Sequence, residues 1–144
     1  MQTAGVTDRK PPFRFAARTR VGFSDTDAQG IVYYGRYLPY FDLARVEYHR
    51  NLELMRVEGF EFVMRAISTE YLAPARFDDL VEIYCRVAHI GRTSAKYAFA
   101  AYKPDVDVLM VTAEQTLVLV DLDERRPQPI PDSWRTRIEE FEQG

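Results

Sequence analysis

The sequence is organised around residues 23–37, which read FSDTDAQGIVYYGRY. Two carboxylates, Asp25 and Asp27, precede a glycine and a run of apolar and aromatic residues that leads into the longest helical pattern of the chain. The first turn of a helix carries backbone N–H groups without intrahelical partners, and such donors stabilise an oxyanion that develops beside them. The stretch therefore predicts a catalytic site in which a carboxylate lies close to an amide that binds an electrophile.

A helix is predicted directly after this stretch, from Arg36 to Glu53. Its apolar residues recur every three or four positions and form one broad stripe. They are Tyr37, Phe41, Ala44, Tyr48 and Leu52. Pro39 lacks an N–H and is tolerated only in a first turn, so the helix should begin close to Arg36. Because His49 falls on the opposite, polar side, we expect it to be exposed to solvent.

The rest of the chain reads mostly as strands, which alternate apolar and polar residues. We expect strands over residues 13–23, 60–72, 80–90, 92–103 and 106–122. Successive strands joined by short turns favour an antiparallel sheet. A short amphipathic helix over residues 132–142 should bury Trp134 and Ile138, with Asp132 or Ser133 as its cap. The fold class is therefore α+β, with five antiparallel strands and one long helix.

Length and composition indicate one globular domain. We expect residues 1–12, which are polar and lack periodicity, to form a flexible tail ahead of a single domain over residues 13–144. The net charge of −3 gives no overall attraction to nucleic acid. No apolar run approaches the ~18 residues that suggest a membrane span. The single cysteine, Cys85, excludes an intrachain disulfide and favours a buried thiol in a reducing, cytoplasmic setting.

The Asp25-Thr26-Asp27 segment fits other templates when it is taken alone. It begins like a calcium-binding loop, but Arg36 occupies the position at which such a loop has a bidentate glutamate. It also resembles the start of phosphatases that form an aspartyl-phosphate, but those need a larger doubly wound domain. A turn in which both carboxylates cap nearby amides is the structural alternative, and for Asp25 it is as good as a functional role. We expect no bound metal.

A longer match narrows these alternatives. Residues 23–45, with the run DTDAQGIVYYGRY, resemble the hotdog-fold acyl-CoA thioesterases, and within them the 4-hydroxybenzoyl-CoA thioesterase group that includes the enzymes of bacterial Tol–Pal gene clusters. Two later stretches match in the same order: residues 71–79, YLAPARFDD, and residues 90–94, IGRTS. The similarity covers about residues 15–122. It implies a hotdog fold, in which a five-stranded antiparallel sheet wraps around the long helix.

The resemblance also implies roles for individual residues. Asp27 would be the catalytic carboxylate, which attacks the thioester or activates water, and the backbone N–H of Tyr34 would polarise the thioester carbonyl. Gly30 and Tyr37 would contact the substrate, with Tyr37 in the lining of an acyl pocket. The residues expected near the nucleotide end of coenzyme A are Arg92, Thr93 and Ser94. A thiolate leaves readily, so the absence of a Ser-His-Asp signature agrees with these roles.

The resemblance implies a dimer whose sheets join edge to edge, with each site lined by both subunits, and often a homotetramer built from two dimers. No cofactor is expected, since coenzyme A belongs to the substrate. The chain departs from the family at Tyr34, where Tol–Pal-type members often carry histidine, and at Arg36, where asparagine is common. Two other functions are compatible with the fold. A dehydratase would need a histidine in the loop before the helix, which is absent, and an acyl-CoA sensor would bind without turnover.

Overall fold

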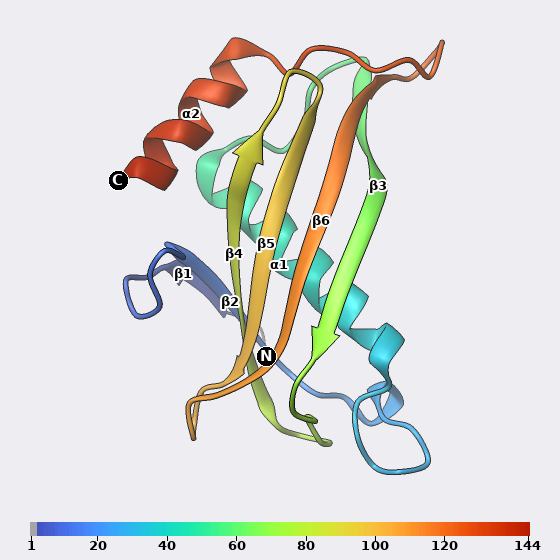
Figure 1. Cartoon of the computed structure of the whole chain (residues 1–144), viewed down its shortest axis with the longest axis vertical. Helices are drawn as coiled ribbons and strands as arrows, with labels where there is room; N and C mark the ends of the chain where they lie inside the picture. Colours follow the sequence, from blue (N-terminus) through green and yellow to red (C-terminus); the bar gives the residue numbers. More distant parts are fainter. Residues whose placement is uncertain (1–2) are drawn as a thin grey trace.

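The computed structural model describes residues 3–144; Met1 and Gln2, which belong to the expected tail, lie outside the described residues. A six-stranded antiparallel sheet packs against one long helix, α1, which crosses one face of it (Figure 1). The strands are β1 (Thr3–Val6), β2 (Phe15–Arg20), β3 (Phe60–Tyr71), β4 (Leu80–Ile90), β5 (Ser94–Lys103) and β6 (Val108–Asp121). Their order in the sheet is β1-β2-β4-β5-β6-β3. Short 3-10 turns η1 (Phe23–Asp25) and η2 (Tyr34–Arg36) precede α1 (Tyr37–Leu52), and α2 (Asp132–Gln143) follows the sheet.

The apolar stripe of α1 forms the core, as its periodicity predicts. Phe41, Ala44 and Tyr48 are completely buried against the sheet. The Phe41 ring packs on Phe99 of β5, with ring centroids 5.0 Å apart. Burying a large apolar side chain contributes about 1.5–3 kcal/mol, so this stripe fixes how α1 lies on the sheet. The helix and the five strands after residue 13 are confirmed, with ends that differ from the predicted ones by a few residues.

The sheet has six strands where the sequence predicted five, because part of the expected tail forms β1. Thr3–Val6 pair with β2 in antiparallel register. The residues between β1 and β2 fold over the sheet, where Arg9 forms an ion pair with Glu82 and Lys10 forms one with Asp107. A four-residue strand is too short to show a periodicity in the sequence. It forms because the edge of β2 offers free backbone groups. The prediction of a tail is therefore wrong for residues 3–6.

The short helix α2 is present, and Trp134 and Ile138 are buried as predicted. Its N-cap residue, however, is Pro131, which provides no side-chain hydrogen bond, so the prediction of an Asp132 or Ser133 cap is wrong. Tertiary contacts hold the helix instead. The Arg135 guanidinium donates hydrogen bonds to the carbonyl oxygens of Ile90 and Gly91 in the β4–β5 turn, the second at 2.8 Å.

The prediction that His49 is exposed to solvent is wrong. Its Nε2 lies 2.5 Å from the hydroxyl of Tyr97 on β5, and its ring lies 5.3 Å from that of Trp134 on α2. Burial, with a smaller contribution from the positive charge of Arg45, lowers the pKa of His49 to about 4. The helical periodicity placed His49 outside the apolar stripe, but its ring reaches Tyr97 of β5 and Trp134 of α2, which together cover it.

This burial makes the stability of the protein depend on pH. Between the ordinary histidine pKa of 6.5 and the folded-state value of about 4, the unfolded chain binds a proton that the folded protein does not. The free energy of unfolding should therefore fall by about 2–3 kcal/mol as the pH drops through this range. Urea titrations of the wild type and of His49→Gln at several pH values measure this loss, which the variant should lack.

His89, the other histidine of the chain, is exposed on β4 and offers the matched control. His89→Gln should keep the pH dependence of the wild type. An equal loss of stability in the wild type and in His49→Gln would show that His49 is not responsible.

Candidate active site

Residues 25–33 form a narrow hairpin that leads into α1. The Tyr33 N–H donates to the carbonyl of Asp25 at 2.9 Å, and the Asp27 N–H donates to the carbonyl of Ile31 at 2.9 Å. Gly30 closes the tip with φ of 79°, a left-handed conformation that glycine adopts without strain. The hairpin thus carries Asp27 near its tip and ends at its base in the first turn before the helix.

The hairpin is fixed to the segment between β3 and β4. The Val32 N–H donates to the carbonyl of Ala75 at 2.8 Å, and Ile31 forms an isolated bridge with Arg76. Val32 and Ala75 are both buried. These contacts join two stretches that are far apart in the sequence, residues 23–37 and residues 71–79, on one side of the molecule.

The Asp27 side chain is half-buried, and one of its carboxylate oxygens accepts no hydrogen bond from residues 3–144. Oδ1 accepts a hydrogen bond from the Gln29 N–H at 2.8 Å, which orients the side chain. Oδ2 accepts none from residues 3–144. The carboxylate therefore caps a local turn and still presents an oxygen that can take a proton from water or attack a carbonyl carbon.

The Asp25 carboxylate, in contrast, is occupied by the protein. It accepts hydrogen bonds from the Gly22 N–H at 2.9 Å, from the Tyr40 hydroxyl at 2.7 Å and from the Arg36 guanidinium at 3.0 Å. Burial alone would raise the pKa of Asp25, but the hydrogen bonds from Tyr40, Gly22 and Arg36 together outweigh it and hold the pKa below its ordinary value. Asp25 stays ionised as a structural carboxylate, which agrees with the structural alternative for this residue.

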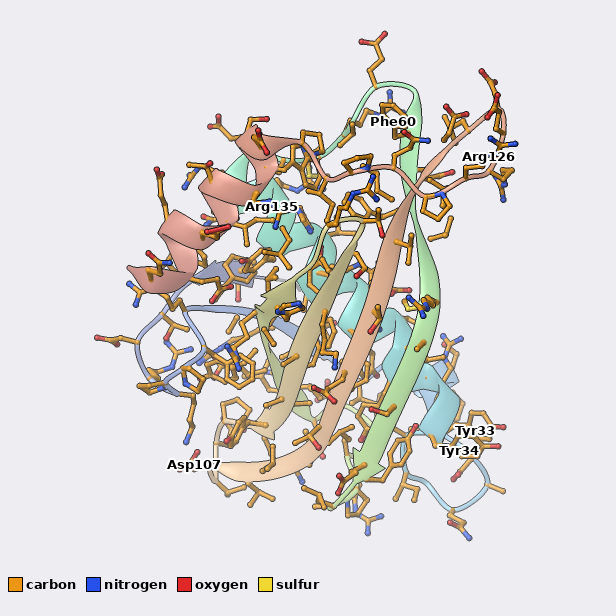
Figure 2. All side chains as sticks on the ribbon, turned by 45° about the horizontal axis from the view of Figure 1, so that its top comes forward. Tyr33, Tyr34, Phe60, Asp107, Arg126 and Arg135 are labelled. Atoms are coloured by element: carbon orange, nitrogen blue, oxygen red, sulfur yellow. The ribbon has the colours of Figure 1, made fainter. Side chains whose placement is uncertain are left out.

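The backbone N–H of Tyr34 is the first donor of η2. Tyr33 before it is extended, with ψ of 134°, and no group within residues 3–144 accepts a hydrogen bond from the Tyr34 N–H. The Tyr33 carbonyl accepts from the Arg36 N–H at 2.8 Å, and the Tyr34 carbonyl accepts from the Tyr71 hydroxyl at 3.0 Å. Figure 2 shows the side chains of Tyr33 and Tyr34 next to each other beside the start of α1. This amide is therefore available to donate a hydrogen bond to a bound group.

Asp27 and Tyr34 line one pocket of about 430 Å³. Its other lining residues are Gln29, Ile31, Val32, Tyr37, Tyr71, Leu72, Ala73 and Pro74. The ring of Tyr71 lies 6.2 Å from that of Tyr34 and 5.8 Å from that of Tyr37. Burial raises the pKa of Tyr37 to about 12, so this tyrosine is neutral at ordinary pH. The pocket is therefore lined by Asp27 and by Tyr34, whose N–H is unpaired, within largely apolar and aromatic walls.

The structure does not bring all predicted site residues together within one chain. Asp27, Tyr34 and Tyr37 share the pocket, whereas Gly30 shapes the hairpin and does not belong to the pocket wall. The Arg92, Thr93 and Ser94 group lies at the β4–β5 turn, at the opposite end of the sheet (Figure 1). Ser94 pairs with Val118 of β6, which in turn pairs with Val63 of β3, so Ser94 and Val63 lie at the same level of the sheet. Tyr71 lies eight residues further along β3. At about 3.3 Å per residue, these two levels are roughly 25 Å apart.

The pocket also contains residues that patterns in the sequence did not identify as site residues. Tyr71, Leu72 and Pro74 line it from the end of β3 and the segment after it. The only signal was that residues 71–79 match the same family as residues 23–45. Among residues 3–144, no group of three or more His, Cys, Asp or Glu side chains could hold a metal ion, and no helix is long and apolar enough to cross a membrane.

The fold and this site define a hotdog protein of the thioesterase class. A sequence profile described as the thioesterase-like superfamily matches residues 21–138, and the chain belongs to that family. The chain is 33% identical over 128 residues to the acyl-CoA thioester hydrolase YbgC of Escherichia coli O6:H1, a match that covers 86% of this chain and 92% of that protein. It is 27% identical over 131 residues to a 1,4-dihydroxy-2-naphthoyl-CoA hydrolase of Synechocystis, covering 86% and 94% of the two chains.

Solved structures agree with this assignment. A hypothetical protein from Aquifex aeolicus superposes with a TM-score of 0.78 at 29% identity, over 86% of this chain and 98% of that one. A thioesterase-superfamily protein from Jannaschia superposes with a TM-score of 0.84 at 23% identity, over 93% and 86% of the two chains. The hotdog fold and the family that the sequence resembles are therefore confirmed.

Proposed function

We propose that this protein is an acyl-CoA thioesterase, which hydrolyses an acyl-CoA or aroyl-CoA thioester to a free acid and coenzyme A. One observation carries the proposal: Asp27, with a carboxylate oxygen that accepts no hydrogen bond, and Tyr34, with an unpaired N–H, line the same pocket. The relatives named acyl-CoA thioester hydrolase and 1,4-dihydroxy-2-naphthoyl-CoA hydrolase support this class of substrate. The buried free thiol of Cys85 is compatible with the cytoplasmic location that we also propose.

The chemistry needs only these two groups. The thioester carbonyl oxygen accepts a hydrogen bond from the Tyr34 N–H, which stabilises the negative charge that develops as the carbon becomes tetrahedral. Asp27 then removes a proton from water as the water oxygen bonds to this carbon. The carbon–sulfur bond breaks, and the thiolate takes up that proton. Alternatively, Asp27 itself attacks and forms an anhydride, which water cleaves in a second step. Both routes give the same products.

A second copy of the chain would complete the site. Strand β3 is an edge of the sheet, and it exposes Met64 and Ile67, with 41% and 42% of their surfaces accessible. A long, unpaired edge with apolar side chains is suited to pairing with another strand. We propose a homodimer in which the β3 strands of two copies pair antiparallel. This pairing brings the Arg92-bearing end of one sheet beside the pocket of the other. Two such dimers would form the proposed tetramer.

Replacing Asp27 tests the proposed carboxylate. Asp27→Asn keeps the shape of the side chain but removes its basicity, so kcat/KM should fall by about 100- to 10,000-fold. The measurement is steady-state hydrolysis of a panel of aliphatic and aromatic acyl-CoA substrates with detection of the released thiol. Asp105→Asn is the matched control, because Asp105 is exposed in the β5–β6 turn and should leave turnover unchanged.

Two results would contradict the proposal. Full turnover in Asp27→Asn would mean that another group performs the chemistry. Saturable binding of acyl-CoA by the wild-type protein, with no hydrolysis across the panel, would instead identify a non-catalytic acyl-CoA sensor.

The Tyr34 amide can be removed by a single substitution. Proline lacks the N–H, and it is tolerated in the first turn of a helix after an extended residue, which is the conformation of Tyr33. Tyr34→Pro should lower kcat by about 100-fold, the cost of losing one oxyanion donor. Tyr34→Ala removes the same ring but keeps the N–H, so its kcat should stay within a few-fold of wild type. Equal kcat values for the two variants would rule out the amide as the donor.

A further inference from the structure

The Asp25 carboxylate contacts residues that precede and follow Tyr34, whose amide is the proposed oxyanion donor. Oδ1 accepts hydrogen bonds from Nε and Nη2 of Arg36 at 3.1 and 3.0 Å. Oδ2 accepts from the Gly22 N–H at 2.9 Å and from the Tyr40 hydroxyl at 2.7 Å. The side chain of Asp25 is only 14% exposed, and Tyr40 is 6% exposed. Four donors thus converge on one carboxylate that is largely shielded from water.

The backbone of the same residues orients the Tyr33–Tyr34 peptide. The carbonyl of this peptide accepts the Arg36 N–H at 2.8 Å, while the N–H of Tyr33, one peptide earlier, donates to the Asp25 carbonyl at 2.9 Å. The N–H on the other side of the Tyr33–Tyr34 peptide is the unpaired Tyr34 donor. Because a peptide is planar, fixing its carbonyl fixes the direction of its N–H. Asp25 and Arg36 are therefore joined twice, through their side chains and through the backbone around this peptide.

We infer that Asp25, Arg36 and Tyr40 form a clamp that positions the Tyr34 N–H for the reaction. None of the three lines the pocket, so they act through the amide and are positioning residues. The effect of the clamp on catalysis rests on the proposed function, whereas its effect on the order of the backbone does not. It gives the first aspartate of the Asp-x-Asp pair a role different from that of Asp27. It also gives Arg36, which stands where asparagine is common in the family, a specific partner.

Amide hydrogen exchange measured by NMR tests the clamp without any substrate. In Arg36→Ala, the Tyr33 amide should exchange at least about tenfold faster than in the wild type, because its acceptor segment is released. Tyr40→Phe removes one hydrogen bond and should accelerate exchange of both the Tyr33 and the Arg36 amides. Arg50→Ala is the control, since it breaks an exposed ion pair with Glu47 on the same helix and should leave these amides unchanged.

Kinetics separate positioning from binding. Loss of the clamp should lower kcat of Arg36→Ala by about tenfold and leave KM within twofold, because the misplaced donor acts on the transition state. Arg36→Lys, which keeps the charge but not the two-pronged contact, should recover part of kcat. Arg36 is 46% exposed in its side chain, so its replacement should leave the fold intact, and Tyr40→Phe provides a second, independent variant.

Each outcome decides between positioning and its alternatives. Unchanged exchange and unchanged kcat in Arg36→Ala and Tyr40→Phe would overturn the clamp. A raised KM with constant kcat would also overturn it, because Arg36 would then bind substrate directly. If the wild-type protein hydrolyses no acyl-CoA, the proposed function fails, while the exchange rates still show whether the clamp exists.

Discussion

In the mechanism that we propose, the direction of one backbone N–H, that of Tyr34, is the constraint on which the rest of the site depends. An amide donor is worth much to catalysis only if it already points at the place where negative charge develops, since reorienting it during the reaction costs free energy. In this chain the peptide is fixed by its own carbonyl, which accepts from Arg36, and by the neighbouring carbonyl, which accepts from Tyr71. The Tyr34 N–H is therefore left without a partner among residues 3–144, between two carbonyl groups that each accept a hydrogen bond.

This arrangement is local in sequence but needs the whole fold to hold it. The stripe of α1 buries Phe41 and Tyr48 against the sheet and so fixes the position of the turn that precedes the helix. The hairpin that carries Asp27 is tied to Ala75, and the far wall of the pocket comes from Tyr71 at the end of β3. The pocket thus lies where the helix start, the hairpin and the end of an edge strand meet. An edge strand also offers the simplest way for a second copy to complete the substrate site.

The parts that could be predicted from the sequence are those that depend on local patterns. The 3.6-residue period located α1, and alternation located β4 and β5, because burial on one face leaves a repeating signal. Contacts between distant segments leave no such signal. Residues 3–6 became a strand only because β2 offers an edge, and His49 is covered because α2 returns over it. Within the site, Asp27 and Tyr34 belong to one stretch and could be paired in advance, whereas the distance from the pocket to Arg92 follows only from the register of the sheet.

The most direct test is a crystal structure of the protein with a stable acyl-CoA analogue, in which a methylene group replaces the thioester sulfur. We expect the carbonyl oxygen of the analogue to lie about 2.7–3.1 Å from the backbone nitrogen of Tyr34. The free oxygen of Asp27 should face the carbonyl carbon, directly or through one water molecule. An analogue bound with its carbonyl remote from both groups, in this pocket or elsewhere, would contradict the account.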